Sequence, residues 1–190
     1  MAFFDTKYKK ELEFLEDNFK KLTTLEKFAA QKGIKDIFQD NGAKVLQQLV
    51  ISGMTNLPGR EGNDAIDSNG VEWEFKSINI ATKASGFSTD HHATEKLLNR
   101  FNSIPWLFSI YNNVQLLEMY VLSPGQLNEW TEQKIKHLRD RGVPSLNNPK
   151  IPLKYVKTNG VRIYPFPDPP IDPATLDGSQ CFEDNKNNSN

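Results

Sequence analysis

Residues 63–76 read NDAIDSNGVEWEFK and contain the pattern that decides the fold. From Val71 to Lys76, apolar and charged residues alternate, which is typical of a strand with one buried and one exposed face. Ser68–Gly70 predict a three-residue turn, because glycine stands where the backbone needs a left-handed conformation. With Asn63–Asp67 as a short preceding strand, the stretch predicts a β-hairpin.

The predicted register of this hairpin brings three charged side chains to one face. Asp64 faces Glu74 across the two strands, and Lys76 follows two residues later on the same side. Carboxylate oxygens are the ligands that Mg²⁺ prefers, and cleavage of a phosphodiester needs charge to be neutralised at phosphorus. The three residues therefore suit a metal-dependent phosphodiesterase. From the pattern alone, the three charged residues could equally form the solvent-exposed face of an amphipathic sheet without any catalytic role.

Periodicity predicts further helices and strands on both sides of the hairpin. The expected elements are helices over residues 5–31 and 43–52, strands over 104–111 and 114–122, a helix from 123 to about 142, and a hairpin of 154–156 with 161–164. Helices and strands without a regular alternation predict an α/β fold of the mixed (α+β) type, a central mixed β-sheet flanked by helices. The first helix carries an apolar stripe that suits either its own core or a partner subunit, formed by Leu12, Leu15, Phe19 and Leu22.

Charge is unevenly distributed along the chain of 190 residues. The net charge is −1, but the residues after Tyr164 are strongly acidic, so residues 1–164 are mildly basic. That balance permits binding of nucleic acid without requiring it. We expect residues 1–164 to form a single domain, and residues 165–190, an acidic and proline-rich stretch, to form a disordered tail.

The composition also indicates the compartment in which the protein works. No apolar run approaches the length of a membrane span, and the N-terminus lacks the layout of a signal peptide. Cys181 is the only cysteine, so no intramolecular disulfide can form. We therefore expect a cytoplasmic protein with no membrane partner.

Two polar clusters contain residue types that read DNA bases. His91 and His92 stand together in one polar stretch. Two adjacent histidines without a third ligand make a poor zinc site. The stretch could also be an ordinary surface loop without a binding role. Asn147 and Asn148 precede Pro149 in the other cluster. Asparagine pairs with adenine in the major groove, although Asn-Asn-Pro is also a common turn.

Longer segments of the chain stand in a characteristic order, namely residues 33–42, 57–65, 76–80, 86–89, 147–152 and 154–156. In this order they resemble the PvuII-type family of type II restriction endonucleases, within the PD-(D/E)-x-K superfamily. The resemblance covers about residues 33–164, most of the expected domain. It implies a restriction-endonuclease-like fold and a homodimer with N-terminal regions at the interface and double-stranded DNA in the cleft.

The resemblance also implies roles for the residues of both patterns. Asp64, Glu74 and Lys76 match the catalytic carboxylates and lysine, and Glu61 matches a nearby acid. The implied metal ligands are Asp64, Glu74 and Glu61, and the implied DNA-binding residues are Asp40, Ser88, His91, His92, Asn147 and Asn148. The implied reaction is Mg²⁺-dependent hydrolysis, with Mn²⁺ able to substitute, at the palindrome CAGCTG with a blunt central cut. A cognate DNA methyltransferase acting on the same site is the implied partner in the cell.

The sequence departs from the family pattern at two positions beside these residues. Asp90 stands where the family has a histidine, and Phe101 stands where it has a tyrosine near the metal site. These changes leave open the fine specificity and the number of metal ions. A structure-specific repair or junction nuclease of the same fold is one alternative function, and a DNA-binding protein without catalysis is another. The presence of Asp64, Glu74 and Lys76 together argues against the second.

Overall fold

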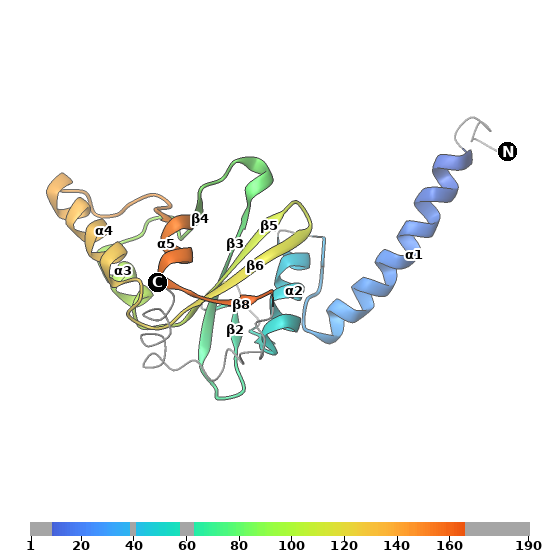
Figure 1. The fold of residues 1–190 in the computed structure, drawn as a ribbon, viewed down its shortest axis with the longest axis horizontal. Coiled ribbons are helices and arrows are strands. Elements are labelled where there is room, and N and C mark those ends of the chain that lie inside the picture. The colour runs from blue at the N-terminus through green and yellow to red at the C-terminus, as the bar shows by residue number, and fades with distance from the viewer. Residues whose placement is uncertain (1–8, 39–40, 58–62, 166–190) are drawn as a thin grey trace, which may run out of the picture. The chain divides into compact units, whose positions relative to one another are not determined.

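The computed structural model describes residues 9–38, 41–57 and 63–165 (Figure 1). The chain divides into two compact units, residues 1–47 and residues 48–190, and each is described here by itself. The expectation of one domain over residues 1–164 stays a prediction. Most of the expected tail, residues 166–190, lies outside the described residues.

The first unit contains the long helix α1, Lys9–Gln31, as the apolar periodicity predicted. The chain turns after this helix with Gly33 in the left-handed region at a φ of 79°, where glycine is favoured. Ala29, Ile34 and Ile37 are buried, whereas Phe28 keeps 40% of its surface exposed. Near the end of α1, the apolar side chains are therefore only partly covered.

Helix α2, Gly42–Ser52, ends as expected, with Gly53 in the left-handed region at a φ of 71°. Its last turns belong to the second unit, where the side-chain amide of Gln48 donates to the hydroxyl of Ser109 over 2.9 Å. Leu49 is buried, but Val50 is 49% exposed. The apolar periodicity of residues 43–52 would place Val50 on the inward face with Leu49, and the exposure of Val50 shows that this interpretation was wrong.

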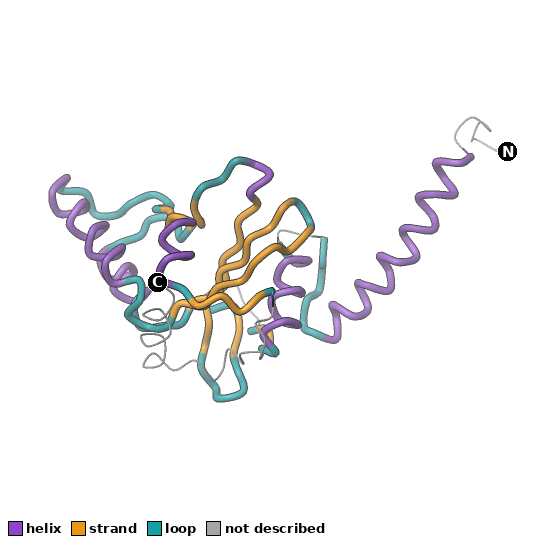
Figure 2. The backbone as a smooth tube through the Cα atoms, viewed as in Figure 1, coloured by secondary structure: helices purple, strands orange, loops and turns teal. Residues whose placement is uncertain are grey.

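A six-stranded mixed sheet organises the second unit, with the strand order β1-β2-β3-β5-β6-β8 (Figure 2). The strands are β1 (Thr55–Asn56), β2 (Ala65–Ile66), β3 (Glu72–Asn79), β5 (Trp106–Asn112), β6 (Gln115–Leu122) and β8 (Val161–Tyr164). Strands β3 and β5 run parallel, and the other neighbours are antiparallel. The prediction of a mixed sheet flanked by helices is confirmed.

The decisive hairpin has the predicted register, since Ile66 pairs with Glu72. One carboxylate oxygen of Asp67 accepts hydrogen bonds from the backbone N–H groups of Asn69 and Val71, over 2.8 and 3.0 Å, and these bonds close the turn. Gly70 occupies the left-handed region at a φ of 80°, as the turn requires.

Further short elements surround the sheet. They are the 3₁₀ turn η2 (Ile80–Thr82), the two-stranded sheet of β4 (Gly86–Ser88) with β7 (Lys150–Pro152), and helices α3 (Glu95–Phe101), α4 (Asn128–Arg141) and α5 (Leu153–Asn159). Helices α3, α4 and α5 lie together to one side of β5 and β6 (Figure 1). A hydrophobic core that includes Phe108, Leu122 and Val156 fills the space between them and the sheet.

The predicted hairpin of residues 154–156 with 161–164 was wrong. Leu153–Asn159 is helix α5, and β8 pairs with β6 instead. Leu153 and Val156 stand three residues apart and pack on one core, which is the spacing of a helix face. A short apolar run of this kind does not distinguish a strand from a helix by itself.

The start of α4 also differs from the expectation. The helix was expected to begin at residue 123, but the α-helix begins at Asn128. The Gln126 side chain still accepts from the backbone N–H of Ser123 over 2.6 Å, as a capping partner would. The helix ends at Gly142, as predicted, with a φ of 60°.

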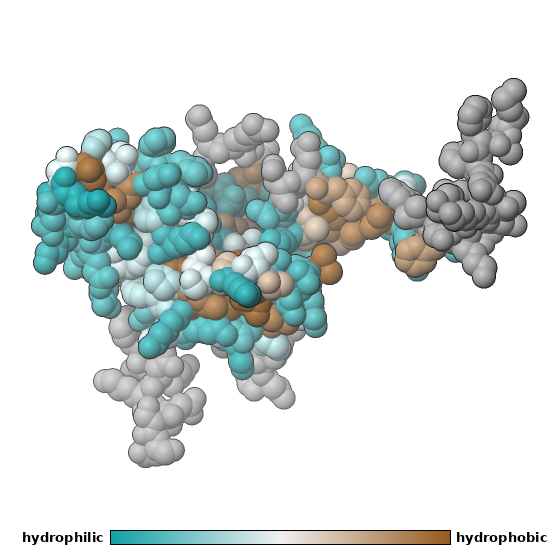
Figure 3. Space-filling view, turned by 90° about the horizontal axis from the view of Figure 1, so that it is seen from above, coloured by the Kyte–Doolittle hydropathy of each residue, from teal (hydrophilic) through white to brown (hydrophobic). Residues whose placement is uncertain are grey.

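None of the described helices is long and apolar enough to cross a membrane. The end of the second unit that carries α4 shows a mostly hydrophilic surface (Figure 3).

Candidate active site

The predicted catalytic residues lie together at the centre of the sheet. Glu74 and Lys76 stand on β3, two residues apart, so their side chains share one face. Asp64 lies just before β2, and its carboxylate accepts the backbone N–H of Phe75 over 2.7 Å. That hydrogen bond fixes the Asp64 carboxylate beside the segment that links Glu74 to Lys76. The structure therefore brings Asp64, Glu74 and Lys76 together, as the hairpin register predicted.

Glu74 and Lys76 form a close ion pair in a largely covered position. The Lys76 Nζ atom lies 2.6 Å from Glu74 Oε1, and the side chains are 18% and 13% exposed, respectively. Removing two charges from water costs free energy that such a pair regains only with good geometry. An ion pair held at this cost, with Glu74 lining a pocket, is a candidate for chemistry rather than for stability.

Burial dominates the electrostatics of this site. Burial, together with the negative charges of Asp64 and Asp90, raises the pKa of Glu74 to about 7 against the opposing effect of Lys76. Burial likewise raises the pKa of Asp64, although the Phe75 N–H and Lys76 favour its ionised form. Burial disfavours the charged form of Lys76, but the Glu74 carboxylate outweighs it, so the pKa of Lys76 is raised.

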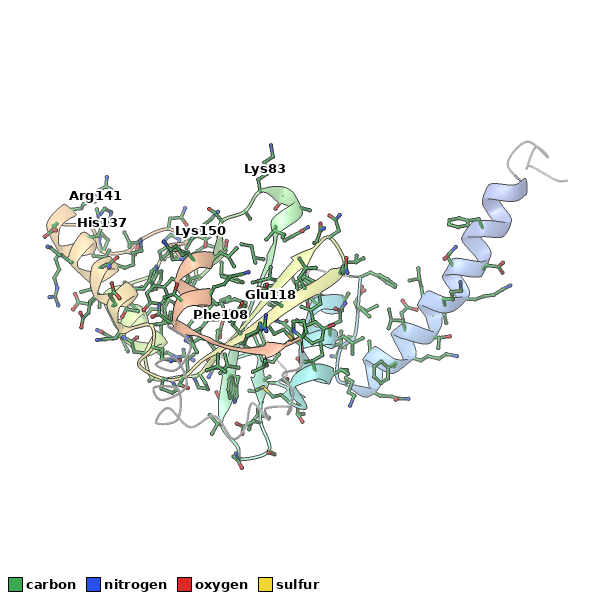
Figure 4. The ribbon with its side chains drawn as sticks, viewed as in Figure 1. Lys83, Phe108, Glu118, His137, Arg141 and Lys150 are labelled. Carbon is green, nitrogen blue, oxygen red and sulfur yellow. The ribbon has the colours of Figure 1, made fainter. Side chains whose placement is uncertain are left out.

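Two aromatic side chains of β5 lie on the same side of the sheet as the ion pair. In the parallel pairing of β3 with β5, Glu74 stands opposite Trp106 and Lys76 stands opposite Phe108, so these side chains project to the same side. Phe108 belongs to the side chains packed between the sheet and the helices (Figure 4). The Lys76 Nζ atom lies 5.8 Å from the centroid of the Trp106 ring. The sequence analysis missed Trp106, because only the long-range register shows its place.

A small pocket opens beside Glu74. It is lined by Asn63, Glu74, Asp90, Leu97, Arg100, Phe101 and Ile104. Phe101 forms part of its apolar wall, with its ring 5.0 Å from Trp106 in an edge-to-face arrangement. Arg100, which the sequence analysis did not single out, donates to the Asn63 side chain over 3.4 Å and brings a positive charge to the pocket.

Asp90 lies nearer to the catalytic residues than its sequence position suggested. It stands where the family has a histidine, and the structure places it on the lining of the pocket together with Glu74. Its negative charge raises the pKa values of both Asp64 and Glu74. No local sequence pattern predicts that Asp90 lies near Glu74, because its place depends on how the loop after β4 packs against β3.

The two predicted DNA-reading clusters meet in space although 56 residues separate His91 from Asn147. His91 Nδ1 lies 2.8 Å from the side-chain oxygen of Asn147, and Thr89 donates to the carbonyl of Pro149 over 2.6 Å. Just before these contacts, Ser88 ends β4 and pairs with Lys150 of β7. The small β4–β7 sheet therefore joins the two clusters into one surface, which we call the recognition surface: Ser88, His91, His92, Asn147 and Asn148.

Asn148 and His92 have uncommon backbone conformations on this surface. Their φ angles are 49° and 57°, in the left-handed region that residues other than glycine rarely adopt. The side-chain oxygen of Asn148 is buried and has no hydrogen-bond partner among the residues that the structure describes. A buried acceptor without a partner costs free energy, so it points to a donor supplied by a ligand.

The residues present fit a divalent cation in part. Asp64 and Glu74 offer the hard oxygen ligands that Mg²⁺ takes, and burial leaves their charge poorly compensated. Over residues 9–38, 41–57 and 63–165, no group of three or more His, Cys, Asp or Glu could hold a metal ion. The third predicted ligand, Glu61, and the predicted DNA-binding residue Asp40 lie outside the described residues.

Comparison with protein families agrees with this geometry. A family model described as restriction endonuclease PvuII matches residues 10–164, which include α1, the whole sheet and the recognition surface. Members of this family are endonucleases with DNA as their substrate, and restriction endonucleases generally use a divalent metal. The match and the arrangement of Asp64, Glu74 and Lys76 lead to one conclusion: the chain belongs to the PvuII family of type II restriction endonucleases.

Proposed function

We propose that the chain hydrolyses double-stranded DNA with Mg²⁺ at the palindrome CAGCTG and makes a blunt cut at its centre. The observation that carries this proposal is the convergence of Asp64, Glu74 and Lys76 on one face of the central sheet. The Asp64 carboxylate is anchored to the Phe75 N–H, and Lys76 is anchored to Glu74. The recognition surface then supplies the groups that would select the sequence.

Each catalytic side chain has a distinct task in this proposal. Asp64 and Glu74, with Glu61, would hold Mg²⁺, which when bound neutralises charge at the phosphate and on the leaving oxygen. Mn²⁺, a cation with similar ligand preferences, is expected to substitute. Lys76, held beside Glu74, orients the attacking water and helps to deprotonate it. The products carry 5′ phosphates and 3′ hydroxyls.

The recognition surface suits a half-site that contains adenine and guanine. The Asn148 side-chain oxygen lacks a partner within the described segments and can accept from adenine N6, while its amide donates to N7. A histidine nitrogen, on His91 or His92, can donate to guanine O6 or N7. Ser88 is exposed beside them and can contact the backbone or a base edge.

Two copies of the chain are required to read a palindrome with one set of side chains each. We therefore propose a homodimer, with α1 contributing to its interface through exposed apolar residues such as Leu25 and Phe28. Since the cut would damage the host genome, a cognate DNA methyltransferase acting on the same site completes the proposed system.

Digestion of a plasmid of known sequence, followed by sequencing of the fragment ends, tests the proposal. We expect Mg²⁺-dependent cutting, with every end lying blunt at the centre of CAGCTG. Chelation with EDTA should stop the reaction, and added Mg²⁺ should restore it. Ends at any other sequence would contradict the proposed site, and cutting after exhaustive chelation would contradict the metal requirement.

A further inference from the structure

The ring of Trp106 lies beside the ammonium of Lys76 at the active site. The ammonium of Lys76 has two neighbours of different kinds: the Glu74 carboxylate at 2.6 Å and the Trp106 ring face, with its centroid at 5.8 Å. An aromatic ring face carries negative electrostatic potential and attracts a cation, most strongly for Trp and when water is excluded.

The Trp106 ring is held rigidly in this place. Its side chain is 1% exposed, and its indole N–H donates to the carbonyl of Phe101 over 2.8 Å. The ring stacks on Phe108 with centroids 5.8 Å apart, and it meets the edge-to-face ring of Phe101 at 5.0 Å. The indole therefore presents a fixed surface to Lys76, whereas the lysine stem has many accessible rotamers.

We propose that Trp106 is a positioning residue for DNA cleavage, because its ring face holds the Lys76 ammonium over the reacting phosphate. This inference rests on the proposed function. Glu74 does not suffice for this task, since the same carboxylate is needed at the metal and phosphate. The ring attracts the ammonium without using a carboxylate oxygen, so Lys76 stays directed at the attacking water.

Three variants separate this role from ordinary core packing. Trp106→Leu removes the ring, and Trp106→Phe keeps a ring face but loses the hydrogen bond to Phe101. Trp130→Leu is the matched control, because Trp130 is also buried, stacks on Phe101 and donates its indole N–H to a backbone carbonyl. Its ring faces Lys134 rather than Lys76.

The first measurement compares single-turnover cleavage in Mg²⁺ with DNA binding in Ca²⁺, below the unfolding temperature of every variant. Trp106→Leu should cut about tenfold more slowly and bind DNA as the unaltered protein does. Trp106→Phe should retain most of the rate, and Trp130→Leu should cut at the unaltered rate. Equal rates for the two leucine variants, or equal losses for both Trp106 variants, would overturn the proposal.

The second measurement does not depend on nuclease activity. Protons above an aromatic ring resonate upfield, so the ε-methylene protons of Lys76, assigned by their loss in Lys76→Arg, should be shifted upfield. The shift should persist in Trp130→Leu and disappear in Trp106→Leu. If Trp106→Leu does not fold, two results still test the proposal: the Lys76 signal of the unaltered protein should be shifted upfield, and Trp106→Phe should retain most of the cleavage rate. The absence of either result would overturn the proposal.

The two measurements also separate this inference from the proposed function. If the unaltered protein cuts no DNA, the proposed function fails, while an upfield Lys76 signal still supports the contact with Trp106. If the protein cuts DNA but the Lys76 signal is not shifted, the inference about Trp106 is overturned and the proposed function stands.

Discussion

Glu74 and Lys76 form an ion pair in a largely buried position, where such a pair contributes little to the stability of a fold. Asp64 adds a second carboxylate, and Asp90 adds further negative charge from the neighbouring loop. At the scale of single residues, the site is therefore strained electrostatically in the absence of a cation. This strain has a measurable consequence at Glu74.

The metal-free protein should lose stability as pH rises through the titration of Glu74. The folded-state pKa of about 7 lies above the ordinary value of 4.5. The folded state therefore binds more protons between these values, and its free energy of unfolding falls as pH rises. Glutamine at this position cannot titrate. The free energy of unfolding of Glu74→Gln, relative to that of the unaltered protein, should therefore rise by up to about 3 kcal/mol between pH 4.5 and pH 8. Urea unfolding in EDTA measures this, and a constant difference across that range would refute it.

Asn148 should determine specificity without contributing to nonspecific binding. Asn148→Gly removes the side chain and tolerates the φ of 49°, so loss of function would not reflect backbone strain. Cognate binding should weaken by about 1–3 kcal/mol, while salt-sensitive binding to unrelated DNA should stay unchanged. Asn99→Ala, an exposed asparagine on α3, is the control. Equal weakening on both kinds of DNA would argue against base reading.

At the scale of elements, the sequence predicted correctly those features that depend on neighbouring residues alone. The hairpin of β2 and β3 was predicted with its register, because alternation and a turn glycine are both visible over fourteen residues. Helix α5 was mistaken for a strand, since a short apolar run fits both periods. The places of Asp90 and Trp106 depend on pairing between distant strands, β4 with β7 and β3 with β5, which no local pattern reveals.

The junction between α5 and β8, where the sequence was misinterpreted, offers a test of the helix. A Cβ atom on Gly160 would lie 2.6 Å from Leu122 Cδ1 and 2.7 Å from the Val156 carbonyl oxygen. Gly160→Ala should therefore lower the free energy of unfolding by about 1–3 kcal/mol. Gly70→Asn is the control, since the turn has open space and asparagine tolerates its positive φ. Urea unfolding that shows no loss for Gly160→Ala would contradict this packing.

At the scale of the whole molecule, the catalytic residues and the recognition surface belong to the same compact unit, residues 48–190. One copy of the chain would therefore carry both the proposed catalytic residues and the proposed base-reading groups for one half-site. A second copy related by a two-fold axis would supply the other half. The family match extends to residue 10 and so includes α1, the proposed interface element.

Sedimentation should show a particle of about twice the chain mass of 21.7 kDa at micromolar concentration. Replacing Leu25 and Phe28, 38% and 40% exposed, with glutamate should shift it to the monomer. Lys21→Glu on the same helix changes charge without removing apolar surface and should leave the dimer intact. A monomeric unaltered protein that still cuts both strands in one binding event would contradict a dimer.

Single-turnover cleavage by Lys76→Ala tests the central claim most directly. In Mg²⁺ with saturating CAGCTG duplex, the variant should cut about 10²–10⁴-fold more slowly than the unaltered protein. Its binding of the duplex in Ca²⁺ should be preserved. Lys134→Ala, whose ammonium also lies over a tryptophan ring, should cut at the unaltered rate. Cleavage by Lys76→Ala at a rate close to that of the unaltered protein would contradict the assignment of this site to catalysis.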